Sequence, residues 1–180
     1  EGTQVYNKQH LVPFGEYFPV PNWVLMLMRQ LNLPSHDLAR GTSEQKPFYF
    51  PIAEKKYQIG LSICFEDVFP DELRTRVPDA GFIVNTTNDA WFDDSVALTQ
   101  HLDIARARAL ELGRPVIQAS NTGVTAAVDP QGVVTHKLPT QQEAVLRVPV
   151  TSYVGMTPYA RWGDFPLWCL SILGLMICAL

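Results

Sequence analysis

The segment that ends at Cys64 constrains the fold most strongly. From residue 57 to residue 63, apolar side chains alternate with glutamine, glycine and serine, and this period of two predicts a strand with one apolar face. The alternation stops at Cys64, and the residues after Asp67 have the pattern of a turn that opens a helix. A cysteine at a strand-to-helix turn lies close to backbone N–H groups that can hold an oxyanion, so Cys64 is a candidate nucleophile. The alternative is a buried core cysteine, since free cysteines are among the most buried residues.

The rest of the pattern is typical of a layered α/β domain. Strand-like runs alternate with helix-like runs, and the run at 81–86 is continuously apolar, as expected in a sheet that is covered on both faces. A Pro/Gly turn at 129–132 predicts a hairpin. Besides the strand that ends before Cys64, the predicted strands are 46–53, 81–86, 114–121, 123–129, 133–137 and 144–150, with the end of a further strand at Val5 and Tyr6.

A helix capped by Asp94 or Ser95 is predicted to end before Gly113. Its apolar residues recur at spacings of four and three, which indicates one buried stripe, and Gly113 is well placed to end the helix in a left-handed conformation. His101 lies in this helix, where a surface or core-edge position is favoured over a catalytic role. The stripe consists of Leu98, Leu102, Ala105, Ala109 and Leu112.

Two apolar segments indicate contact with lipid. A helix predicted at 22–33, capped by Asn22, contains an uncharged run that starts at Trp23, and a helix that is apolar on every face is either buried or in contact with lipid. Residues 165–180 carry no charge and predict the start of a transmembrane helix that continues beyond the chain. The alternative for this second segment is a buried C-terminal core helix.

The composition argues against several other classes of protein. The formal net charge of −4 at pH 7 gives no basic surface for nucleic acid. The three cysteines lack zinc-like spacing, and a disulfide framework is not expected. Since no cluster of histidine, cysteine and aspartate indicates a metal site, neither a metal nor another cofactor is expected.

Four segments together resemble the nitrilase superfamily, and within it the family of apolipoprotein N-acyltransferases. The first is a rigid aromatic loop at 6–17 that carries Lys8 and Glu16. Taken without the resemblance, such loop charges are more simply explained as solvent-facing. The other segments are 63–66, 85–92 and 107–111, and the stretch 158–161 that leads into the apolar C-terminal run is also similar to that family.

The resemblance implies a nitrilase-like α/β/β/α sandwich with a Glu-Lys-Cys triad. Cys64 corresponds to the nucleophile, and Lys8 to the residue that stabilises the oxyanion together with backbone N–H groups after the cysteine. Glu16 and Glu66 correspond to the supporting carboxylates of the family. The residues expected to contact the substrates are Phe65, Trp91 and Trp23.

The implied reaction moves a fatty acyl chain from a phospholipid, through a thioester on Cys64, to the α-amino group of the N-terminal diacylglyceryl-cysteine of a lipoprotein. The implied partners are this phospholipid donor, the lipoprotein acceptor and the bilayer, with the catalytic domain on the periplasmic side of the bacterial inner membrane. One alternative is a soluble nitrilase or amidase that cleaves a small C–N bond, although such an enzyme gives no reason for the uncharged C-terminal run. A membrane-tethered binding module without catalysis is the other alternative.

The chain departs from the family pattern in three places. The general-base glutamate of the family lies upstream of the lysine, and only seven residues precede Lys8, so this segment is expected to be inactive alone. Phe65 occupies a position where many members carry tyrosine, and Asp93 one where glycine is common. The expected division is an N-terminally truncated catalytic domain at 1–160, followed by an interfacial segment and a partial transmembrane helix at 161–180.

Overall fold

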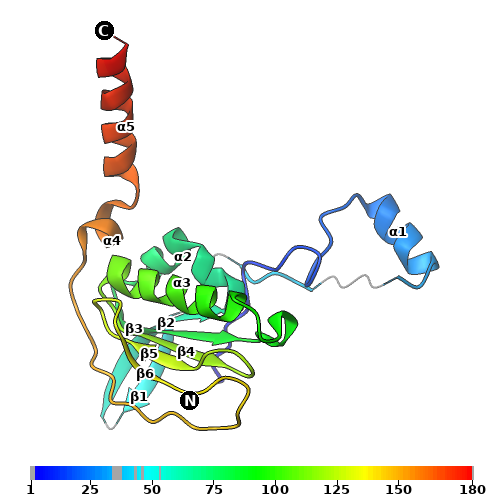
Figure 1. The fold of residues 1–180 in the computed structure, drawn as a ribbon, viewed down its shortest axis with the longest axis horizontal. Helices are drawn as coiled ribbons and strands as arrows, with labels where there is room; N and C mark the ends of the chain where they lie inside the picture. Colours follow the sequence, from blue (N-terminus) through cyan, green and yellow to red (C-terminus); the bar gives the residue numbers. More distant parts are fainter. Residues whose placement is uncertain (1–2, 34–37, 43, 46, 53, 180) are drawn as a thin grey trace. The chain divides into compact units, whose positions relative to one another are not determined.

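The computed structural model describes residues 3–33, 38–42, 44–45, 47–52 and 54–179 (Figure 1). The chain forms two units, residues 1–46 and residues 47–180. Where the structure describes it, the first unit is irregular chain with one helix, and the second contains a sheet with its covering helices.

The helix of the first unit is α1, Asn22–Gln30. The prediction that Asn22 caps this helix was wrong, because Pro21 takes the cap position with φ −59 and no side chain caps the helix. Proline fits there since its φ is already fixed near the helical value and it has no N–H to leave unpaired. No residue of α1 is buried, which excludes the buried alternative for this helix within its unit. The strand end predicted at Val5 and Tyr6 is also wrong, since both lie in irregular chain.

The second unit is built on one mixed sheet, as the α/β prediction requires. Its six strands follow one another in the order β1-β2-β3-β4-β5-β6. The pairs β2–β3 and β3–β4 are parallel, and the other three pairs are antiparallel. The strands are β1 (Phe48–Ile52), β2 (Lys55–Ile63), β3 (Ala80–Thr87), β4 (Val116–Ser120), β5 (Ala126–Val128) and β6 (Val134–Lys137).

These strands confirm the predicted ones, with one exception. The strand predicted at 144–150 is absent, and Val145 in that segment is 81% exposed. The segment therefore pairs with no strand of the sheet, although Pro149 and Val150 line a hollow together with Ile117 and Ala127. Residues 46 and 53, the ends of the predicted strand that became β1, lie outside the described residues.

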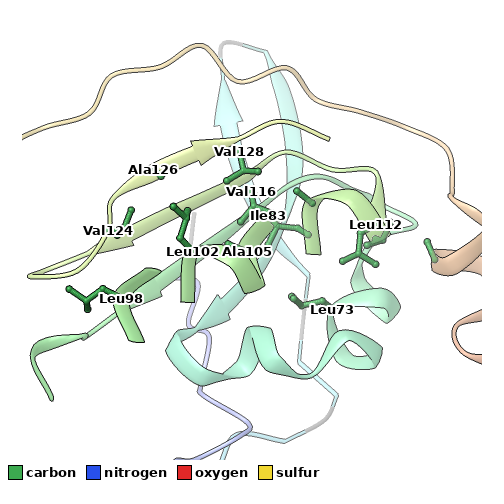
Figure 2. Close-up of a cluster of buried hydrophobic side chains, with 13 residues drawn as sticks. Leu73, Ile83, Leu98, Leu102, Ala105, Leu112, Val116, Val124, Ala126 and Val128 are labelled. Atoms are coloured by element: carbon green, nitrogen blue, oxygen red, sulfur yellow. The ribbon is translucent and has the colours of Figure 1, made fainter. Parts of the chain in front are cut away.

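The helices α2 (Pro70–Arg76) and α3 (Ala97–Leu112) cover one face of the sheet (Figure 1). Figure 2 shows the core between them, where the side chains of both helices meet those of β3, β4 and β5. All five residues of the predicted stripe on α3 are buried, and Gly113 ends the helix with φ 62, so both predictions are confirmed. The prediction that Asp94 or Ser95 caps this helix was wrong, because Val96 takes the cap position. Ser95 lies one residue earlier, where its Oγ accepts the N–H of Ala97 at 3.3 Å.

The opposite face of the sheet carries a second apolar row. The register of the strands places the side chains of this row on the face of the sheet opposite Ile83 and Val116 of the core. Within the second unit, the irregular segment 149–153 borders a hollow on this face, and none of that unit's helices covers it (Figure 1). The row consists of Ile59, Leu61, Phe82, Val84, Ile117 and Ala127.

Two helices end the chain, α4 (Pro158–Trp162) and α5 (Phe165–Cys178). Thr157 caps α4 by accepting the N–H of Ala160 at 2.9 Å, and its hydroxyl donates to the C=O of Glu111 at the end of α3. No residue of α5 is buried, so the alternative of a buried C-terminal core helix was wrong. Among the helices described here, none combines the length and the apolar character needed to cross a bilayer.

Candidate functional site

The candidate nucleophile lies at a strained turn. β2 ends at Ile63, and the short 3-10 helix η1 (Cys64–Val68) follows it directly, which confirms the predicted strand-to-helix turn. Cys64 has φ 53, a left-handed conformation that costs a non-glycine residue about 1–3 kcal/mol. Its side chain is half-buried and is not part of the buried hydrophobic cluster. The thiol is therefore not packed in the core, so the alternative of a buried core cysteine was wrong.

Asn85 of β3 holds the backbone of this turn. Its Oδ1 accepts the N–H of Cys64 at 3.0 Å, and its Nδ2 donates to the C=O of Cys64 at 3.3 Å. The same Nδ2 donates to Oδ2 of Asp67 at 2.7 Å. One buried amide thus satisfies both backbone groups of the strained residue, which buried polar groups require.

Two acids of η1 are buried and bind different parts of the turn. Glu66 is 1% exposed, and its Oε2 accepts the N–H of Ile63 at 2.7 Å, as a glutamate three residues into a helix commonly does. Asp67 is 2% exposed, and its backbone C=O accepts Nη1 of Arg108 at 3.3 Å. Since the N–H groups of Ile63 and Cys64 already have partners, donors for an oxyanion beside the thiol would come from residues after Cys64.

Lys8 and Glu16 lie together in the first unit. The Lys8 Nζ is 2.8 Å from Oε1 and 2.7 Å from Oε2 of Glu16. Glu16 Oε2 also accepts the N–H of Val12 at 2.8 Å, which fixes the carboxylate to its own loop. The Lys8 side chain is only 11% exposed, so it does not simply point to solvent. The structure therefore places Lys8 beside Glu16 in the first unit, and it places Cys64 and Glu66 in the same short helix of the second unit.

The three residues expected to contact substrate differ in exposure. Phe65 is half-buried, and its ring packs edge-on against Phe69 with the centroids 5.3 Å apart. Trp91, in the short helix η2 (Ala90–Phe92), is 74% exposed, and Trp23 on α1 is 68% exposed. Both indole rings are thus available to a ligand or a surface.

An ion cluster at the ends of β2 and β3 was not predicted from sequence. His101 of α3 forms an ion pair with Asp67 (Nε2–Oδ2 3.1 Å) and contacts Asp89 (Nδ1–Oδ1 3.0 Å). Burial alone would lower the pKa of His101, but the two carboxylates outweigh burial and raise the pKa to about 10. Burial would likewise raise the pKa of Asp89, but hydrogen bonds from His101 and Ser120 hold it below its ordinary value. The imidazole is therefore a buried cation at neutral pH.

The signal that could have indicated this cluster lies in the strand ends. Asp67 follows β2 and Asp89 follows β3, and the carboxyl ends of parallel strands meet at one edge of a sheet. We call this edge, where β2 and β3 end, the carboxyl edge. The sequence favours a surface or core-edge position for His101, and its position beside the apolar stripe is consistent with the latter. Its charge partners, however, could be recognised only once β2 and β3 were paired.

Comparison with known proteins finds relatives that match nearly the whole chain. A sequence model of the carbon–nitrogen hydrolase family matches residues 1–159. The Apolipoprotein N-acyltransferase of Azotobacter vinelandii is 42% identical over 174 residues, which cover 96% of this chain and 33% of that protein. The protein of the same name from Pasteurella multocida is 40% identical over 178 residues, 98% of this chain and 34% of that protein. The chain thus spans about a third of the length of these curated relatives.

Among solved structures, a weaker likeness is found to Saccharomyces cerevisiae Nit3, a member of branch 10 of the nitrilase superfamily. Its TM-score is 0.48 at 20% identity, covering 59% of this chain and 40% of that chain. The sequence matches are therefore the stronger of the two comparisons.

Proposed function

This chain belongs to the carbon–nitrogen hydrolase family, and from that premise we propose that it is part of an apolipoprotein N-acyltransferase. The proposed reaction transfers a fatty acyl chain from a phospholipid to the α-amino group of a diacylglyceryl-cysteine at the N-terminus of a lipoprotein. The observation that carries the proposal is the match of 96–98% of the chain, at 40–42% identity, to curated proteins of that name. The strained, half-buried Cys64 supplies the nucleophile that such a transfer needs.

The proposed mechanism has two acyl-transfer steps. Sγ of Cys64 attacks the ester carbonyl of the phospholipid, the C–O bond breaks, and the lysophospholipid leaves with a proton. The amine of the acceptor then attacks the thioester, the C–S bond breaks, and an amide and a free thiol result. Since a thiolate is the reactive form, a base must remove the thiol proton, and the family resemblance assigns this role to a glutamate upstream of Lys8.

We assign the remaining roles from the family resemblance, and the charges and hydrogen bonds within each unit support them. The Lys8 ammonium supplies positive charge for the oxyanion and for the thiolate, and Glu16 holds the ammonium through both carboxylate oxygens. Glu66 stabilises the turn through the N–H of Ile63. Because Asn85 occupies the N–H of Cys64, we assign the backbone part of the oxyanion hole to residues after the cysteine.

We further propose that the second apolar row of the sheet packs against another sheet. Phe82, Val84 and Ile117 on this row are only half-buried within the second unit, and a contiguous apolar face in water is unfavourable. A second sheet on this face would complete the α/β/β/α sandwich that the family resemblance implies. The helices α2 and α3 would then form one outer layer.

Two exposed apolar helices support a place at the membrane. On α1, Trp23 and Met26 are 68% and 60% exposed, and α5 is an uncharged helix without a buried residue. We propose that both contact the bilayer, with Trp23 facing the acyl chains and α5 forming part of a membrane anchor. The proposed side is the periplasmic face of the bacterial inner membrane, where the lipoprotein substrates are processed.

A covalent adduct tests the proposed reaction. The full-length protein in detergent is incubated with a phospholipid of defined acyl chain, and its intact mass is measured without an acceptor. We expect a mass increase equal to one acyl group, lost in Cys64→Ala and retained in the matched variant Cys169→Ala, whose thiol lies exposed on α5. If the folded full-length protein forms no such adduct, the proposal is contradicted.

The same protein distinguishes the amidase alternative. A soluble nitrilase or amidase would release ammonia from small amides and would form no acyl adduct with phospholipid. Lys8→Ala is expected to abolish adduct formation with the fold intact, whereas Lys137→Ala, an exposed residue on β6, leaves it unchanged. Adduct formation by Lys8→Ala at the wild-type rate would remove Lys8 from the proposed site.

Membrane contact by α1 is tested separately with vesicles. Replacing Trp23 and Met26 by aspartate is expected to reduce flotation of the protein with phospholipid vesicles. Val133→Asp is the matched control, because Val133 is 56% exposed in a turn of the second unit. Equal flotation of the two variants would argue against α1 as a lipid contact.

A further inference from the structure

His101 connects two segments that leave the sheet at its carboxyl edge. Its side chain is 11% exposed, and each ring nitrogen faces one carboxylate: Nε2 faces Asp67 of η1, and Nδ1 faces Asp89 of the loop after β3. Neither nitrogen offers a lone pair to a metal, and in the part of the chain that the structure describes no group of such side chains could hold a metal ion. A bridging cation is therefore the role that its geometry allows.

The Asp67 side of this bridge leads to the nucleophile. Oδ2 of Asp67, which contacts His101, also accepts Nδ2 of Asn85 at 2.7 Å. Asn85 in turn accepts the N–H of Cys64 and donates to its C=O. A shift of Asp67 would therefore reach the strained Cys64 backbone through one buried side chain.

The Asp89 side of the bridge leads to a different segment. Oδ1 of Asp89 accepts Oγ1 of Thr87 at 2.9 Å, and Oδ2 accepts Oγ of Ser120 at 2.8 Å. The backbone N–H of Asp89 donates to Oδ1 of Asn121 at 3.1 Å. These contacts fix the start of the loop that carries Trp91, without a bond to Cys64.

We propose that His101 is a positioning residue, which holds the Cys64 turn through Asp67 and the loop at 88–92 through Asp89. The inference rests on the proposed function in taking Cys64 as the nucleophile. Its physical basis is that two buried carboxylates near one another are unfavourable unless a cation lies between them. Through Nε2, His101 holds the Asp67 carboxylate in place, and Asp67 keeps Asn85 in the orientation that supports the left-handed Cys64.

A matched pair of variants separates the two sides of the bridge. The amide nitrogen of glutamine occupies the place of Nε2, so His101→Gln keeps a donor toward Asp67 and loses the one toward Asp89. The amide nitrogen of asparagine occupies the place of Nδ1, so His101→Asn does the reverse. Both variants lose the positive charge, and both are expected to lower the melting temperature to a similar extent. His136→Asn, at an exposed histidine on β6, serves as the control.

The readout is the reactivity of Cys64 in the full-length protein. The rate of alkylation of Cys64 by iodoacetamide, followed by peptide mass spectrometry, is measured beside the rate of acyl-adduct formation from phospholipid. We expect His101→Asn to slow both rates about 10–100-fold with little change in the phospholipid KM, since small misplacements of a reacting group cost this much. His101→Gln is expected to stay within about threefold of wild type. Equal slowing by the two variants, or none by His101→Asn, would overturn the inference.

Two further measurements keep the test decisive. If His101→Asn does not fold, Asp67→Asn and Asp89→Asn replace the pair, and only Asp67→Asn is expected to slow alkylation of Cys64; equal rates would overturn the inference. Alkylation needs no phospholipid, so it reports on positioning even if the wild-type protein forms no acyl adduct. In that case the proposed function fails, while a difference between the paired variants still supports His101 as a positioning residue.

Discussion

Two residues near the carboxyl edge adopt positive φ without being glycine, and they are held very differently. Cys64 follows β2 with φ 53, and Asp93 follows η2 with φ 46 and ψ −139. Asn85 binds both backbone polar groups of Cys64, and Glu66 binds the residue before it. Asp93 is exposed, and its side chain makes no hydrogen bond to the described residues.

This difference indicates which strained turn is tied to function. A strained residue persists where its surroundings over-determine the conformation, and such residues gather at active sites. The strain at Cys64 is supported by buried hydrogen bonds that end in the His101 cluster, whereas the strain at Asp93 has no comparable support. The first is therefore expected to matter for reactivity and the second only for stability.

The largest effect is expected when the strain at Cys64 is relieved. Cys64→Gly removes the nucleophile and should abolish acyl-adduct formation, as Cys64→Ala does. The two variants should differ in stability, with Cys64→Gly more stable by about 0.5–1 kcal/mol, because only glycine adopts positive φ without steric cost. Denaturant unfolding measures this order. If Cys64→Ala is instead more stable than Cys64→Gly, Cys64 is not strained.

The next effect concerns the support of the turn. Asn85→Ala removes the partner of the Cys64 N–H and C=O and leaves Asp67 Oδ2 with His101 alone, and we expect a loss of about 2–4 kcal/mol in the free energy of unfolding. Gln118 is the matched control, since it pairs with Asn85 in the register, is fully buried, and its side-chain amide makes no hydrogen bond within the described part of the chain. Gln118→Leu should therefore be neutral or stabilising. A comparable loss in both variants would mean that Asn85 acts through packing alone.

The sequence predicted those parts of this edge that depend on local pattern. The alternation before Cys64 identified β2 and its turn, and the stripe of α3 identified the covering helix, because both are set by the period of neighbouring residues. The resemblance identified Lys8 and Glu16, which the structure places in contact.

Features that depend on distant partners could not be predicted in this way. Asn85 and His101 take their roles from the parallel pairing of β2 with β3, which no local pattern reveals. The strand predicted at 144–150 failed for the same reason, because a strand needs a partner edge as well as apolar residues. The cap predicted at Asn22 failed because the preceding proline took that position.

The pH dependence of stability sharpens the comparison further. The pKa of His101 is raised from 6.5 in the unfolded chain to about 10 in the fold, so its contribution is complete below about pH 6.5 and is lost as the pH rises toward 10. We expect the free energy of unfolding to fall by up to about 1.4 kcal/mol per pH unit between pH 7 and 9. Urea unfolding of wild type and His101→Gln isolates this slope, because the other groups titrate in both proteins. Parallel pH curves would show that the imidazole is not held as a cation by Asp67 and Asp89.

The smallest effect is expected at the unsupported turn. With φ 46 and ψ −139, Asp93 lies close to a region of backbone space that only glycine occupies readily. Asp93→Gly should therefore raise the free energy of unfolding by about 1 kcal/mol, with the rate of adduct formation on Cys64 unchanged. Asp93→Ala keeps the Cβ and removes the carboxylate, so it should give no such gain. If alanine stabilises the protein as much as glycine does, the gain comes from removing a charge beside Asp94, and the strain at Asp93 contributes nothing measurable.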